Sequence, residues 1–147
     1  MQDEAYQSTE RRVTRMLGRI LVVLGVWDVI SFLMELRQHT FVDEAGIPYP
    51  TGAIAAVGCA AGLLALLKIG AGVLGILQCN GRYITVHIPM AAVLLTIQII
   101  GLLISAAGIV GGGEIVGRAL LLDGVQAIAE AVFLWGAKNV KREDTPV

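Results

Sequence analysis

Four long apolar stretches cover most of this chain, and each is long enough to cross a lipid bilayer. They occupy residues 17–36, 52–77, 83–110 and 115–135. The hydrocarbon core of a bilayer requires about 20 predominantly apolar residues in a helix. The sequence therefore predicts an all-α integral membrane protein, in which residues 1–147 form a single domain of four transmembrane helices.

Composition supports this class and excludes others. Of the 147 residues, 56% are hydrophobic, and the mean hydropathy is +0.75, which is too apolar for a soluble domain of this size. The net charge of −1 does not indicate the basic surface of a nucleic-acid-binding protein, so no such partner is expected. Asp28 and Glu35 interrupt the first apolar stretch, and no small-residue cleavage site follows it. We therefore expect a retained helix and not a signal peptide.

The basic residues predict an orientation in the cell membrane. Cytoplasmic connections carry an excess of Lys and Arg, which should place both termini and the turn at 79–82 in the cytoplasm. The three-glycine turn at 111–113 is short, as is the turn at 79–82, so both should join antiparallel neighbours in an up-down-up-down four-helix bundle. The basic residues on the predicted cytoplasmic side are Arg11, Arg12, Arg15, Arg19, Arg82, Lys138, Lys141 and Arg142, against Arg37 and Arg118 on the other side.

Small residues form a stripe along one face of the second span. Two of its glycines have the G-x-x-x-G spacing, which lets the backbones of two membrane helices approach closely. The predicted packing residues are Gly58, Gly62, Ala65, Gly72 and Gly75. Because Lys68 lies at the edge of this stripe, we expect its side chain to point into protein.

Lys68 lies near the middle of its span, where an unpaired charge is costly and usually has a structural or functional role. Asp28 in the first span lies at the same depth if the two helices are antiparallel, so it is the first candidate for an ion pair. Asp123 in the fourth span is the second. The pair either fixes the register of the helices or takes part in handling an ion, a proton or a substrate.

The first and fourth spans share the pattern D-x-x-[S/Q]-x-x-x-E, which places three polar side chains on one helix face. Four carboxylates then accompany one lysine, so one aspartate should be protonated, hydrated or held at a subunit contact. Glu35 and Glu130 are expected near enough to the membrane faces to reach water. Gln98 should hydrogen-bond across helices. The predicted intramembrane polar cluster is Asp28, Lys68, Asp123, Gln126, Glu130, Glu35 and Gln98.

A few isolated aromatic and histidine residues carry less information. Tyr83, Phe133 and Trp135 are expected to act as aromatic anchors at the cytoplasmic interface. His39 and His87 fall on opposite sides of the membrane and cannot share a metal ion. The sequence contains no catalytic motif, and we expect neither a metal nor a cofactor.

These features leave two main functional hypotheses. The first is a non-enzymatic multi-pass subunit that packs through its Gly-rich helix faces, either with copies of itself or with a larger membrane complex. The alternative is a small oligomeric proton- or ion-coupled transporter or channel that uses Lys68 and the intramembrane acids. An enzyme is the least favoured class, because no nucleophile–base set is apparent.

Overall fold

The computed structural model describes residues 8–38, 47, 50–110 and 117–144, and this part of the chain is almost entirely helical. The helices are α1 (Thr9–Gln38), α2 (Thr51–Cys79), α3 (His87–Val110) and α4 (Gly117–Asp144). Within the described residues, α1, α2 and α3 are long and apolar enough to cross a membrane. The 111–113 turn, and most of the connection between α1 and α2, lie outside the described residues.

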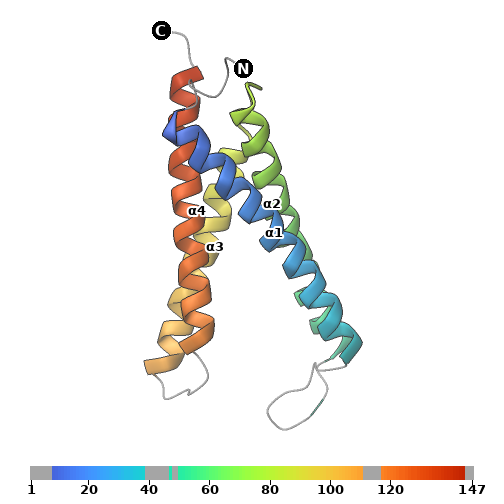
Figure 1. Cartoon of the computed structure of the whole chain (residues 1–147). Helices are drawn as coiled ribbons and strands as arrows, with labels where there is room; N and C mark the ends of the chain where they lie inside the picture. The colour runs from blue at the N-terminus through green and yellow to red at the C-terminus, as the bar shows by residue number, and fades with distance from the viewer. Residues whose placement is uncertain (1–7, 39–46, 48–49, 111–116, 145–147) are drawn as a thin grey trace.

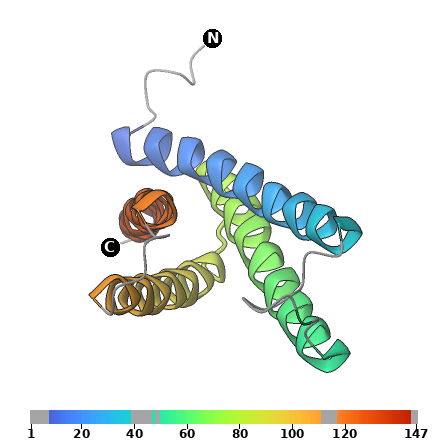
Figure 2. The same cartoon turned by 90° about the horizontal axis from the view of Figure 1, so that it is seen from below.

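The four helices form two pairs that meet at one end and spread apart toward the other (Figure 1). We call the meeting point the closed end. There the first turns of α1 and the last turns of α2 and α4 come together, as the contacts of Thr14 with Gly136 and of Gln78 with Ala137 show. Viewed from below in Figure 2, α1 and α2 lie on one side and α3 and α4 on the other. The structure is thus a pair of hairpins joined at the closed end.

The α1–α2 hairpin is held by glycines at close backbone approaches. A Cβ atom on Gly25 would lie 2.9 Å from the Ala65 carbonyl oxygen, and one on Gly18 would lie 2.8 Å from the Gly72 carbonyl oxygen. The contact residues recur at spacings of three, four and seven, the repeat of helices packed side by side. They are Gly18, Val22, Gly25 and Phe32 on α1, and Gly58, Ala65, Ile69, Gly72 and Ile76 on α2.

A small apolar core fills the closed end. Its largest side chain, Phe133 of α4, is completely buried and packs against Gly75 of α2. The expectation that Phe133 anchors the protein at the interface is therefore wrong, because the helices converge around it. Trp135 and Tyr83 remain exposed. The core residues are Leu17, Leu21, Ala71, Ala91, Leu94 and Phe133.

The turn between α2 and α3 ends the second helix cleanly. Gly81 has φ +88°, and its N–H donates to the Gln78 carbonyl while that of Arg82 donates to the Leu77 carbonyl. These bonds form a Schellman motif, in which glycine takes the left-handed position after the helix. Arg15 of α1 adds a hydrogen bond of 3.2 Å from Nη2 to the Cys79 carbonyl. The last turn of α2 is thus fixed by its own sequence and by α1.

The third helix begins at His87 and not at residue 83 as the apolar stretch predicted. The proline at 89 lacks a backbone N–H and restricts the residue before it, so it fits only within the first turn of a helix. Residues 83–86 therefore form an irregular approach to α3. The fourth helix runs beyond residue 135 to Asp144, while residues 115–116 lie outside the described part.

We predict that Gly72→Ala destabilises the fold by roughly 1–3 kcal/mol, because overpacking against fixed atoms forces the backbones apart. The new Cβ would meet the Gly18 carbonyl oxygen and the Val22 side chain. The control is Gly101→Ala in α3, since a Cβ on Gly101 has nothing within 4 Å. Unfolding titrations in mixed detergent micelles measure both. Equal stability of the two variants would contradict the proposed close packing of α1 on α2.

Candidate functional site

The central polar contact joins α1 to α2. Lys68 Nζ lies 2.6 Å from Asp28 Oδ2, with 9% of the lysine side chain exposed and 35% of the aspartate side chain exposed. This ion pair confirms the first partner expected for Lys68. It is short enough to be a charge-assisted hydrogen bond. In a region of low dielectric the two charges attract each other more strongly than at a surface, and this attraction offsets the cost of removing both from water.

Helix packing one turn away explains why the pair can form. Gly25 precedes Asp28 by three residues, and Ala65 precedes Lys68 by three. Gly25 has no side chain, which lets its backbone approach the Ala65 carbonyl. Because the two helices run in opposite directions, Asp28 and Lys68 lie on either side of this approach along the axis. Side chains tilt toward the N-terminus of their own helix, so the two charged groups point back toward the approach and meet.

Glu130 of α4 belongs to the same polar region but is not where the sequence suggested. Its side chain is 1% exposed, so the expectation that it reaches water at a membrane face is wrong. The reason is that α4 continues to Asp144 and packs on α1 beyond Glu130. Glu130 Oε1 accepts a hydrogen bond of 3.4 Å from Gln126 Nε2, and its carboxyl group interacts electrostatically with Lys68 and Asp28.

Asp123 lies nearer the open end of α4 and does not pair with Lys68. Gln98 Nε2 of α3 donates a hydrogen bond of 3.5 Å to the backbone carbonyl of Asp123. This is a contact between helices of the kind expected for Gln98. Among the described residues, the Asp123 carboxylate has no hydrogen bond or ion pair. Glu35 lies on α1, but its side chain is outside the described part.

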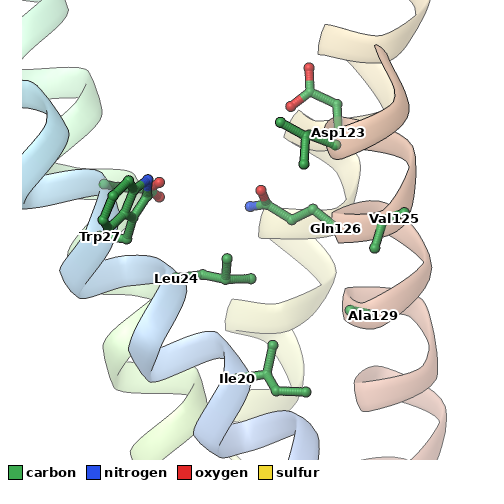
Figure 3. A pocket seen from close by; sticks show the side chains of 9 residues that line it. Ile20, Leu24, Trp27, Asp123, Val125, Gln126 and Ala129 are labelled. Carbon is green, nitrogen blue, oxygen red and sulfur yellow. The ribbon is translucent and has the colours of Figure 1, made fainter. Parts of the chain in front are cut away.

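A groove separates α1 from α4 beside this region (Figure 3). Its volume is about 390 Å³, and it contains two of the predicted acids together with Gln126. In Figure 3, Trp27 of α1 and Gln126 of α4 face each other across it, with Leu24 lower in the view. The lining residues are Ile20, Leu24, Trp27, Asp28, Leu122, Asp123, Val125, Gln126 and Ala129.

The closed end contains a second group of buried polar side chains, which the sequence pattern did not predict. His87 is fully buried, and its ring lies edge-on to Phe133 with centroids 6.2 Å apart. Gln78 is also buried, and its Nε2 lies 3.5 Å from the Ala137 carbonyl. The available signal was the short α2–α3 turn, which necessarily brings residues 78 and 87 to one end. The described residues contain no group of three or more side chains placed to hold a metal ion.

The predicted packing residues divide into two sets. Gly58, Ala65 and Gly72 lie against α1, and Gly75 lies against Phe133 of α4. Gly62, in contrast, has open space where a Cβ would be. The G-x-x-x-G pair is therefore split within the chain: a Cβ on Gly58 would meet Phe32 of α1, whereas one on Gly62 would meet nothing within 4 Å.

Comparisons with protein-family models, with curated proteins and with solved structures find no match to this chain. The chemistry of the site therefore follows from its own residues. It combines one neutralised acid–lysine pair with a carboxylate that has no partner among the described residues. Such an arrangement can hold a cation or a polar group of a neighbouring helix.

We predict that the Lys68–Asp28 pair is costly to break and easy to replace. Lys68→Met alone should destabilise the protein by roughly 3–5 kcal/mol, because it leaves a buried carboxylate unpaired. The double variant Lys68→Met with Asp28→Leu should recover most of that loss, since an apolar pair of similar volume is often neutral. Reversible unfolding in mixed micelles measures the cycle.

Glu10→Gln is the matched control, because Glu10 lies in the first turn of α1, away from the pair. It should change stability by less than about 0.5 kcal/mol. A double variant no more stable than Lys68→Met alone would show that the pair is not the main partner of either charge.

Proposed function

We propose that this protein is a non-enzymatic, multi-pass subunit of the cell membrane that associates through a glycine-rich helix face. The partner is a second copy of the chain or a larger membrane complex. In this proposal all four helices cross the bilayer up and down, and the closed end lies in the cytoplasm.

The proposed topology is supported by helix length and by charge. The fourth helix has 28 residues, about 42 Å at 1.5 Å per residue, which exceeds the hydrocarbon core of about 30 Å. Exposed basic residues, including Arg12, Arg82 and Lys138, lie in the segments that meet at the closed end. Cytoplasmic loops carry such an excess of positive charge, which favours this orientation.

The observation that carries the proposed association is the uncovered small-residue face of α2. We call it the α2 outer face and define it as Gly52, Ala55, Cys59 and Gly62. Neither glycine has an atom within 4 Å of a Cβ position, and Ala55 and Cys59 are exposed. Residues at these spacings share one side of a helix. Small residues let membrane helices pack closely. A helix face that contacts only lipid has no such need for small residues and can carry leucine instead.

The wider surface is consistent with either lipid or protein neighbours. Between 17 and 28% of the residues in the apolar windows of α1, α2 and α3 are buried within the chain. Large apolar side chains such as Leu63 and Leu66 border the α2 outer face and are exposed. A partner helix seated on the small residues would be flanked by these leucines.

We predict that Gly62→Leu weakens self-association at least tenfold, because the leucine fills the position of the partner backbone. Gly101→Leu is the matched control, since Gly101 of α3 also has nothing within 4 Å of a Cβ but lies off the α2 outer face. Single-molecule photobleaching in nanodiscs or native mass spectrometry in mild detergent measures the subunit number. A wild-type protein that is monomeric and alone in extracts from its own membrane would overturn the association.

The alternative, a small oligomeric proton- or ion-coupled transporter or channel, is favoured by one observation. The Lys68–Asp28 ion pair and the Gln126–Glu130 hydrogen bond interact electrostatically, and Asp28 and Gln126 line the α1–α4 groove. Intramembrane acids in such a position mark ion and proton pathways in other membrane proteins.

We predict from this alternative that Glu130→Gln reduces ion or proton flux into liposomes at least tenfold, with Glu10→Gln as the control. Flux is followed with a pH-sensitive dye or a potential-sensitive dye across an imposed gradient. Flux equal to that of empty liposomes would remove the transporter from consideration and leave the subunit proposal standing.

A further inference from the structure

We propose that the groove between α1 and α4 binds a lipophilic organic monocation, held between the Asp123 carboxylate and the Trp27 indole. This site is separate from the association proposed above. It consists of other residues than the α2 outer face and does not depend on a partner subunit.

The groove has the size and lining of a small-molecule site. Its volume of about 390 Å³ falls within the range of roughly 300–1,000 Å³ found for ligand pockets. Apolar side chains form most of its lining, including Ile20 and Leu24 from α1 and Leu122 from α4. Pockets with such walls bind the apolar part of a ligand, and a few polar groups fix its orientation.

The groove is open on the lipid side. Trp27, Leu122 and Val125 line it and are themselves largely exposed, at 62%, 72% and 64%. In a membrane these side chains border the acyl chains, so a ligand dissolved in the bilayer reaches the groove directly. This favours a ligand that partitions into lipid.

The charges of the groove select a cation. Asp28 is neutralised by Lys68 at 2.6 Å, whereas the Asp123 carboxylate has no partner among the described residues. An anion would meet Asp123 without compensation, and a neutral ligand would leave the carboxylate unpaired in a region where charge is costly. One positive charge balances one carboxylate, which indicates a monocation.

The remaining lining residues favour an organic cation over a metal ion. Calcium takes 6–8 oxygen ligands and magnesium requires near-ideal octahedral geometry, but the groove supplies carboxylate or amide oxygens only from Asp28, Asp123 and Gln126. Trp27 lines the opposite wall, facing α4 (Figure 3). Indole is the strongest aromatic partner for organic cations, and its face tolerates a bulky, weakly hydrated charge.

The test uses tetraphenylphosphonium, with tetraphenylborate as an anion of the same shape. The chain contains two tryptophans, so Trp135→Phe leaves Trp27 as the only indole reporter. In nanodiscs, tetraphenylphosphonium should change the Trp27 fluorescence saturably, whereas tetraphenylborate should not compete. Radiolabelled ligand binding, corrected for empty nanodiscs, measures the same affinity without relying on tryptophan.

Asp123→Asn should weaken binding at least tenfold, and Glu10→Gln should leave it unchanged. Trp27→Leu should weaken binding in the radioligand assay more than Trp27→Phe does. Circular dichroism and thermal unfolding verify that each variant is folded, and Asp123→Glu provides a folded variant that restores the charge if Asp123→Asn does not fold. The proposal is overturned if binding does not exceed empty nanodiscs, if tetraphenylborate competes equally, or if a folded Asp123→Asn variant binds like wild type.

Discussion

The buried ammonium group of Lys68 on α2 constrains the rest of this structure. In hydrocarbon, Lys68 cannot be left without a counter-charge at reasonable cost, and Asp28 supplies it at 2.6 Å. The pair forms only because α1 and α2 approach closely, which in turn requires glycine at positions 18, 25 and 72. Charge and packing are therefore one constraint: the glycines bring the helices together, and the ion pair fixes their register.

The second hairpin follows a different principle. It joins the first mainly at the closed end, where Phe133 fills the core and buried polar side chains lie around it. Away from this end, α1 and α4 diverge (Figure 1). The groove is lined by residues of these two helices. The polar residues of α4 thus lie partly against the first hairpin, as Glu130 does, and partly along the groove, as Asp123 does. Residues seven apart on one helix face accordingly have different environments.

The sequence predicted the helices and the ion pair because both depend on one-dimensional information. Apolar length defines a membrane helix, and equal depth in antiparallel helices identifies Asp28 as the partner of Lys68. The sequence did not predict the burial of Glu130 or Phe133, because their burial depends on how α4 packs against α1 and α2. Nor did it separate Gly58 from Gly62, since residues four apart share a helix face and only the position of Phe32 on α1 distinguishes their surroundings. Pro89 indicates the start of α3 near His87, whereas hydropathy alone places that start too early.

Because Lys68 and Asp28 both belong to the α1–α2 hairpin, their contact is independent of the angle between the two hairpins. The residues that join α2 to α3, Asn80 to Val86, include no helical turn longer than the Schellman motif. A rotation at this joint would alter the width of the α1–α4 groove and leave the Lys68–Asp28 contact intact. The residues that hold the ion pair thus all belong to one hairpin, whereas the groove is completed by the other hairpin and depends on the angle between the two.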